Sequence, residues 1–156
     1  MFRVVLYEPK IPPNTGNIIR LCANSGADLH LIAPLGFVLD DAKLRRAGLD
    51  YREFARVQVH ASLEVFLTAE KPPRVFACSK FGLRHYSEVS FQPGDALLFG
   101  SETEGLPASL KEALPPDQLL RIPMLPDNRS LNLSNAVAVV LYEAWRQNRF
   151  EGAKEV

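Results

Sequence analysis

Short apolar runs that alternate with longer segments of helical period are the feature of this sequence that most restricts its fold. The runs are mostly apolar throughout, which is typical of strands covered on both faces. We expect strands at Arg3–Leu6, Leu29–Ile32, Val57–Val59, Val75–Cys78, Ala96–Phe99 and Leu119–Ile122. We expect helices at Thr15–Ser25, Asp41–Arg46, Leu63–Glu70, Ala108–Ala113 and Asn135–Arg149. The pattern predicts an α/β fold with a mostly parallel sheet and helices on both faces.

Prolines fall mainly in the connections between these elements, as at Pro12-Pro13 and Pro72-Pro73. Because the residue before a proline resists the helical conformation, these positions mark element boundaries. The chain has 156 residues and no internal repeat or low-complexity linker, so we expect one domain over residues 1–156. The longest apolar stretch, Ala136–Tyr142, is far shorter than the ~20 residues that cross a bilayer. With no signal-peptide pattern at the N-terminus, the expected location is the cytoplasm.

The charge and cysteine content excludes few functions. The 18 basic and 18 acidic residues cancel, which neither indicates nor excludes a nucleic-acid partner. Cations gather between positions 43 and 56, and on charge alone a solvated surface is the favoured interpretation. The two cysteines form no C-x-x-C pair, and the three histidines are widely spaced. We therefore expect reduced thiols and no metal site.

The last expected helix begins with a stretch, Ala136–Leu141, that is apolar on every face. A helix with one face on a sheet normally has polar residues on the other face. Both faces of this helix are therefore expected to be covered, either within its own domain or by a second copy of the chain. A homodimer is the favoured alternative, because a terminal helix rarely lies at the centre of a domain.

Three polar segments follow expected strands, at the positions where α/β proteins usually bind ligands. The first, Pro12–Arg20, opens a helix that Asn14 or Thr15 can cap. The amides and the guanidinium there also suit a phosphate or a developing oxyanion. The second, Leu98–Pro107, has two glycines that permit close approach to a ligand.

The second segment lacks the Lys-Ser/Thr pair of a phosphate-binding loop, and the chain has neither a G-x-G-x-x-G nor a G-x-S-x-G motif. Nucleoside triphosphate, dinucleotide and esterase chemistry are therefore not supported. The third segment, Ile122–Ala136, is rich in prolines and amides. Ser134 or Asn135 can cap the helix that follows, and the segment fits either a structural loop or a rigid clamp for a planar ligand.

The three segments together resemble a known family. NTGNIIRLCAN, FGSETEGLP and IPM followed by SLNLSNAVA are similar to the three motifs of SpoU-type (SPOUT) RNA 2′-O-ribose methyltransferases. The resemblance extends through EPKIPP, DDAKLRRAGLDY and LYEAWRQ, and so covers nearly the whole chain. In order, spacing and length the chain looks most like the small members that methylate the ribose of nucleotide 34, a cytidine or uridine, in tRNA.

This resemblance implies more than the residues alone indicate. It implies a deep trefoil knot in the C-terminal part, a homodimer, and S-adenosyl-L-methionine bound in the knot and released as S-adenosyl-L-homocysteine. The implied reaction transfers the methyl group to a ribose 2′-hydroxyl in the anticodon stem-loop of tRNA, without a metal or a membrane. The alternatives are a SpoU-type enzyme acting on rRNA or another tRNA position, and a non-catalytic dimeric RNA-binding module.

The resemblance also assigns residues. The cofactor site is carried over to Cys78, Ser79, Gly100, Glu102, Gly105, Ile122, Met124, Ser130, Leu131 and Asn135. Backbone groups of Cys78, Ile122 and Leu131 are expected to hold the adenine. One residue departs from the family pattern: Glu104 stands where many relatives carry a small, polar or basic residue.

Arg20 matches the arginine that the family uses in catalysis. Because a guanidinium is effectively always protonated, we expect Arg20 to stabilise the developing alkoxide rather than to act as a base. Asn14 and Asn17 are expected to orient the ribose or Arg20, with helix capping as the alternative. Tyr142 is expected either to assist from the dimer interface or simply to pack there. The candidate phosphate contacts are Lys10, Arg20, Lys43, Arg45, Arg46 and Arg52.

Overall fold

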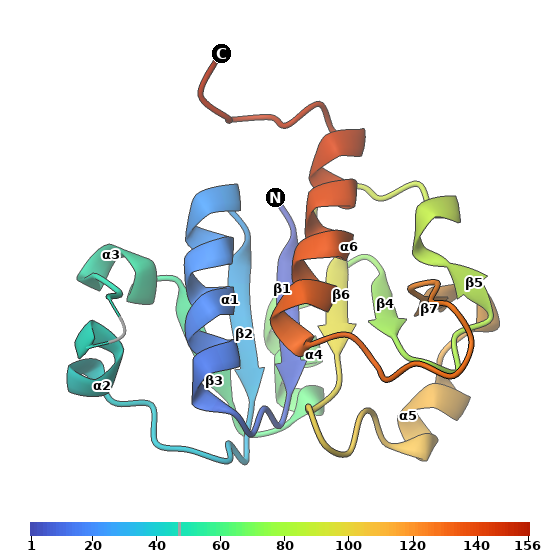
Figure 1. The fold of residues 1–156 in the computed structure, drawn as a ribbon, viewed down its shortest axis with the longest axis horizontal. Helices are drawn as coiled ribbons and strands as arrows, with labels where there is room; N and C mark the ends of the chain where they lie inside the picture. Colours follow the sequence, from blue (N-terminus) through green and yellow to red (C-terminus); the bar gives the residue numbers. More distant parts are fainter. Residues whose placement is uncertain (47) are drawn as a thin grey trace.

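The computed structural model describes residues 1–46 and 48–156. Seven strands form one sheet in the order β3-β2-β1-β6-β4-β7-β5, and neighbouring strands are parallel (Figure 1). The strands are β1 (Arg3–Tyr7), β2 (Asp28–Ile32), β3 (Val57–His60), β4 (Val75–Cys78), β5 (Arg84–His85), β6 (Ala96–Phe99) and β7 (Leu119–Arg121). Within the described chain the sheet confirms the parallel α/β fold.

Helices cover both faces of the sheet (Figure 1). They are α1 (Pro12–Ser25), α2 (Asp41–Arg46), α3 (Tyr51–Phe54), α4 (Leu63–Glu70), α5 (Ala108–Ala113) and α6 (Leu133–Gln147), with single 3₁₀ turns η1 (Tyr86–Glu88) and η2 (Pro116–Gln118). On one face, α1 and α6 bury residues such as Ile18 and Val137. On the other face, α4 and the loop before α5 bury Phe66 and Leu106. Burial of apolar surface against both faces is the main force that holds these layers together.

The sequence predicts β4 and β6 with their observed bounds, but it misses β5 and α3. Both missed elements are too short to carry a hydrophobic period. Helix α1 begins earlier than expected, at Pro12, where a missing N–H costs nothing. Its N-cap is Ile11 without a side-chain hydrogen bond, so capping by Asn14 or Thr15 was wrong.

The helix α6 also begins earlier than expected. Its N-cap is Asn132, whose side-chain oxygen accepts hydrogen bonds from the backbone amides of Ser134 and Asn135. Capping by Ser134 or Asn135 was therefore wrong. The difference matters for the site, because the Asn132 side chain also bonds outside its own helix, as described below.

The register of the sheet brings the ends of distant strands together. Phe99 at the end of β6 pairs with Leu6 of β1 on one side and with Cys78 of β4 on the other. Cys78 also pairs with Leu120 of β7. The segments that follow these four strands therefore leave the same edge of the sheet. All three motif segments are among them.

The end of α6 is bonded to the segment that leads into β6. The Gln147 amide donates to the carbonyl oxygen of Val89 at 2.9 Å and accepts from the backbone amide of Phe91 at 2.8 Å. Asn148 donates to the carbonyl oxygen of Phe91 at 3.2 Å. The trefoil knot that the family resemblance implies stays a prediction. In the described part of the chain, the helices are all too short or too polar to cross a membrane.

Candidate active site

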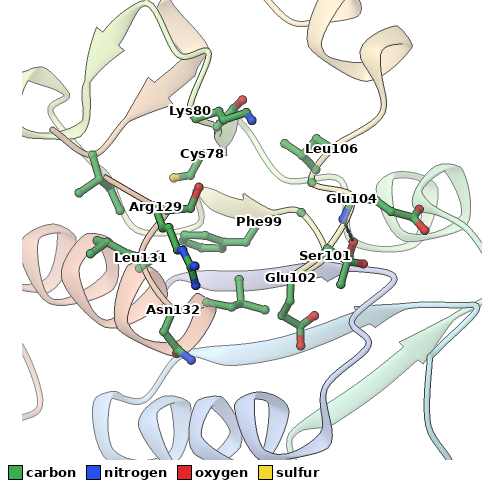
Figure 2. Close-up of a pocket in the computed structure, with 18 of the residues that line it drawn as sticks. Cys78, Lys80, Phe99, Ser101, Glu102, Glu104, Leu106, Arg129, Leu131 and Asn132 are labelled. Carbon is green, nitrogen blue, oxygen red and sulfur yellow. Dashed lines mark hydrogen bonds between the residues drawn. The ribbon is translucent and has the colours of Figure 1, made fainter. Parts of the chain in front are cut away.

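A cavity of about 510 Å³ opens at the carboxyl ends of β4, β6 and β7 (Figure 2). Its volume lies in the usual range for small-molecule sites. The walls come mainly from three loops, residues 78–81, 99–106 and 122–133, together with the start of α1 and α6. Figure 2 shows Cys78 and Lys80 at the top of this space, Arg129 and Leu131 at its left, and Glu102 and Asn132 at its bottom.

The Glu102 carboxylate joins the first two motif segments. It accepts hydrogen bonds from the backbone amides of Lys10 at 2.9 Å and Ile11 at 2.7 Å, and from the Asn14 side-chain amide at 3.2 Å. The Asn14 oxygen in turn accepts from the Asn132 side-chain amide at 3.0 Å. Since Asn132 caps α6, one chain of hydrogen bonds connects all three motif segments around the cavity.

The surroundings of Glu102 favour its ionised form. Burial raises the pKa of this carboxyl, but the amides of Lys10 and Ile11 and the Asn14 side chain lower it. The net result is a pKa below the ordinary value of 4.5. At neutral pH Glu102 is therefore a fixed carboxylate that accepts hydrogen bonds, and it is poorly suited to donate a proton.

Two glycines shape the loop after β6. A Cβ on Gly100 would clash with the backbone of Gly105 and Leu106, so the loop can fold back on itself only with glycine there. Gly105 has a φ of 66°, in the left-handed region that favours glycine. The sequence assigned both glycines to close approach of a ligand. In the structure, Gly100 is required first by the close approach of the chain to itself.

Most of the residues carried over to the cofactor site line this cavity. They are Cys78, Ser79, Gly100, Glu102, Gly105, Ile122, Met124, Ser130 and Leu131. Asn135 lies apart from the described lining, in the first turn of α6, where its backbone amide donates to Asn132 at 3.4 Å. Burial raises the pKa of the Cys78 thiol to about 12, so this lining residue is not a thiolate nucleophile at neutral pH.

Arg20 lies away from this cavity. Its guanidinium donates to the Gly48 carbonyl oxygen, and its Nε lies 3.4 Å from the carboxylate of Glu53 in α3. Arg20 and Asn17 instead line a second cavity of about 300 Å³ between α1 and a wall formed by residues 37–39, Lys43 and Leu49. Of the four residues assigned to catalysis, Asn14 alone is in the described lining of the first cavity.

Tyr142 and most of the candidate RNA contacts lie at the surface. Tyr142 is 40% exposed on α6, and its ring packs edge-on against Trp145 at a centroid distance of 5.4 Å. It is absent from the described lining of both cavities. Lys10 is half-buried beside Glu102. The other cations are exposed on α2 and α3 next to α1: Lys43, Arg45, Arg46 and Arg52.

Sequence reasoning missed several residues at the mouth of the first cavity. Phe81 is 58% exposed, and the ammonium nitrogens of Lys111 and Lys80 lie 4.4 Å and 5.1 Å from its ring centroid. Arg129 and Asn132 also line this cavity. The Lys80-Phe81 pair after a strand was a usable signal, but Lys111 is brought there only by the fold. Among the described residues, no group of His, Cys, Asp and Glu suits a metal ion.

Comparison with known proteins gives a consistent result. The model of the SpoU rRNA Methylase family matches residues 1–142. The chain is 61% identical over 153 residues to a tRNA (cytidine(34)-2′-O)-methyltransferase of Escherichia coli strain K12, and the match covers 98% of each chain.

Solved structures agree with this match. A structure that gives insights into the 2-OH methylation of C/U34 on tRNA has a TM-score of 0.87 and 47% identity, and the match covers 96% of this chain and 97% of that one. The SpoU methyltransferase AviRb of Streptomyces viridochromogenes, solved in complex with AdoMet, has a TM-score of 0.79 and 26% identity. That match covers 97% of this chain and 58% of the larger one.

We predict that Glu102→Gln lowers the midpoint of thermal unfolding at pH 7 by roughly 5 °C. Both carboxylate oxygens accept hydrogen bonds from amides, whereas the glutamine side chain has only one accepting oxygen and places an NH2 donor where the other oxygen was. A lowered folded-state pKa gives stability that is present above the unfolded pKa and is lost as the pH falls through the folded pKa. The difference between variant and wild type should therefore shrink below about pH 4.

Glu104→Gln is the matched control, because Glu104 belongs to the same loop and is exposed. It should leave the unfolding midpoint within about 1 °C of the wild type. Thermal unfolding followed by circular dichroism at several pH values measures both variants. Equal midpoints for Glu102→Gln and wild type at pH 7 would contradict the role given to this carboxylate.

Proposed function

This chain belongs to the SpoU rRNA methylase family, and we propose that it methylates the ribose 2′-hydroxyl of nucleotide 34, a cytidine or uridine, in tRNA, with S-adenosylmethionine as the methyl donor. It is thus an S-adenosylmethionine-dependent tRNA 2′-O-methyltransferase. The observation that carries the proposal is the meeting of three motif segments at one cavity, joined through Glu102, Asn14 and Asn132. The proposed site of action is the anticodon stem-loop, in the cytoplasm, without a metal.

The lining of the first cavity suits S-adenosylmethionine. Ile122, Met124 and Leu131 offer apolar walls for an adenine, next to backbone groups that can read its edge. Glu104 and Arg129 line the same space and supply both signs of charge for an amino-acid end. When bound, the cofactor supplies an electrophilic methyl group on a sulfonium. The residues of the chain bind it, orient it and exclude water from it.

Arg20 is the proposed catalytic residue. The 2′-oxygen gains negative charge as it is alkylated, and a guanidinium held in place stabilises that charge. The Gly48 carbonyl and the Glu53 carboxylate hold the Arg20 side chain in a defined orientation. Asn17 lines the same second cavity and is proposed to position the ribose. Asn14 is proposed to act through Glu102 and Asn132, as a positioning residue for the cofactor cavity.

A homodimer explains why Arg20 and the cofactor cavity lie apart in one chain. On α6, the outward Val139 and Tyr142 are 37% and 40% exposed, while Val137 and Val140 are fully buried. An exposed apolar face of this kind suits a second copy of the chain. A dimer formed through α6 and α1 would bring Arg20 of one protomer to the cofactor cavity of the other. The site is then complete only in the dimer.

The proposed RNA surface is the set of exposed cations on α2 and α3, namely Lys43, Arg45, Arg46 and Arg52. They flank α1 and the second cavity, which Lys43 also lines. Contacts from such side chains to phosphates position an RNA without reading its sequence. Two copies of this surface in a dimer would present twice the local positive charge to an RNA, although the net charge of the chain is zero.

The function is tested by incubation of the protein with labelled S-adenosylmethionine and total tRNA, followed by mapping of the methylated nucleotide. We expect one 2′-O-methyl group at position 34 and none in a reaction with an RNA that carries 2′-deoxyribose there. Methylation of rRNA or of another tRNA position would contradict the substrate. Cofactor binding without transfer to any RNA would indicate a binding module instead.

We predict that Arg20→Lys lowers turnover by at least about 100-fold and leaves the affinity for S-adenosylmethionine within about twofold of the wild type. An ammonium cannot reproduce the planar fork of the guanidinium, and Arg20 lies outside the cofactor cavity. Single-turnover methyl transfer and titration calorimetry measure the two quantities. Arg56→Lys, at an exposed position, is the matched control. Wild-type turnover in Arg20→Lys would remove Arg20 from catalysis.

We predict that Val139→Glu raises the dissociation constant of the dimer at least about tenfold, because it places a charge on the apolar outer face of α6. Turnover at a protein concentration below that constant should fall with the dimer fraction. Sedimentation equilibrium and activity are measured on the same samples. Val65→Glu, at a 48% exposed valine of α4 on the opposite face of the sheet, is the control. Full activity of a monomer would overturn the dimeric site.

A further inference from the structure

The second cavity, between α1 and residues 37–39, Lys43 and Leu49, has features beyond the Arg20 and Asn17 that the proposed reaction uses. It has a volume of about 300 Å³ and largely apolar walls, which include Pro12, Pro13, Phe37 and Leu39. Arg20 and Lys43 supply positive charge, and the described lining has no acidic residue. Flat apolar walls beside cations suit a planar heterocycle attached to a phosphate chain.

One residue that lines this cavity, Thr15, has a buried hydroxyl without a partner in the described chain. Thr15 is 1% exposed and is part of the cavity lining. Within the described chain, its Oγ1 has no hydrogen-bond partner. Buried polar groups are almost always satisfied, so an orphaned one calls for an explanation such as a ligand that completes it. Thr15 therefore indicates a polar partner that enters the cavity.

The next residue of α1 supports the same conclusion independently. Gly16 lies in the interior of α1, where glycine is unfavourable for a helix. A Cβ built on Gly16 would meet only Leu49 Cδ1, at 3.9 Å, which is ordinary contact. Packing within the described chain therefore does not require a glycine here, because the methyl group of an alanine would fit. Its absence keeps open the space of the second cavity, which Gly16 lines.

We propose that this second cavity binds the pyrimidine base of the target nucleotide, with the Thr15 hydroxyl as the contact to its Watson–Crick edge. The proposal rests on the function proposed above. The base is attached to C1′ of the ribose, next to C2′, so a base in this cavity holds the 2′-oxygen close to Arg20, which lines the same cavity. The side chain of Lys43 is placed to contact an adjoining phosphate.

The chemistry of the hydroxyl fits two pyrimidines. A threonine hydroxyl rotates and can either donate or accept a hydrogen bond. It can accept from the 4-amino group of cytosine or donate to the 4-oxygen of uracil. One side chain therefore satisfies C and U at the same position. A fixed donor or a fixed acceptor would select one of the two bases.

The test compares Thr15→Val, Thr15→Ser and wild type as full-length proteins at saturating S-adenosylmethionine. The substrates are two anticodon stem-loop RNAs that differ only in carrying C34 or U34. Valine keeps the shape and removes the hydroxyl, so kcat/KM should fall about tenfold on both RNAs. Serine keeps the hydroxyl, so its kcat/KM should stay within about threefold of the wild type. Cofactor affinity should be unchanged in both variants.

A stability measurement separates this role from a structural one. If the hydroxyl is unpaired in the free protein, Thr15→Val should raise its unfolding midpoint by about 2–4 °C while it lowers activity. Gly16→Ala should likewise raise the midpoint and should weaken RNA binding, because it narrows the cavity. Thr68→Val, at an exposed threonine of α4, is the control and should change neither quantity.

The outcomes are distinguishable. Wild-type kcat/KM for Thr15→Val on both RNAs would overturn the base site while position-34 methylation by the wild type stands. A loss of activity in step with a lower unfolding midpoint would assign Thr15 to structure and also overturn it. A change in dimer dissociation with unchanged RNA binding would show that a second copy of the chain fills the cavity. Failure of the wild type to methylate position 34 would overturn the proposed function itself and, with it, this inference.

Discussion

The carboxylate of Glu102 is the group on which the rest of the site depends. It accepts hydrogen bonds from two successive backbone amides that precede α1 and from Asn14 within it. Asn14 relays the contact to Asn132, which caps α6. The three segments are 118 residues apart at their extremes, between Asn14 and Asn132. A single ionised side chain, held in that state by the groups it orders, thus fixes the relative positions of the three motif segments around the first cavity.

Helix α1 contributes different residues to each of the two cavities. Its first turn contributes Asn14 to the cofactor cavity, whereas Thr15, Gly16 and Arg20 belong to the second cavity. A reaction that joins contents of the two cavities needs either a large movement or a second protomer. The hydrogen bonds to Glu102 oppose movement of the helix, and the exposed apolar face of α6 favours a second protomer. Dimerisation is therefore part of the proposed chemistry and not only a matter of stability.

The sequence alone predicts the parallel sheet, because apolar runs at strand spacing are local patterns with a direct physical meaning, and the family resemblance predicts most of the residues that line the first cavity. Strands β4 and β6 follow from the apolar runs, and lining residues such as Ile122 and Leu131 follow from the family motifs. The sequence does not predict which side chain caps α6 or where the Arg20 side chain points. Those outcomes depend on partners such as Gly48 and Glu53, which only the tertiary fold brings near Arg20.

The second cavity is where the chain departs from the rules that otherwise describe it. A glycine in a helix interior and a buried hydroxyl without a partner both lower stability. Neither is offset by a contact within the described chain. Local departures of this kind tend to gather where a protein binds something. Arg20 adds a cation to the same small space, so Thr15, Gly16 and Arg20 of α1 all line it, and the first two are unfavourable for stability. A pyrimidine nucleotide suits all three residues. Its polar edge can pair with the Thr15 hydroxyl, its flat ring can fill the space beside Gly16, and its negative charge can meet the cation of Arg20.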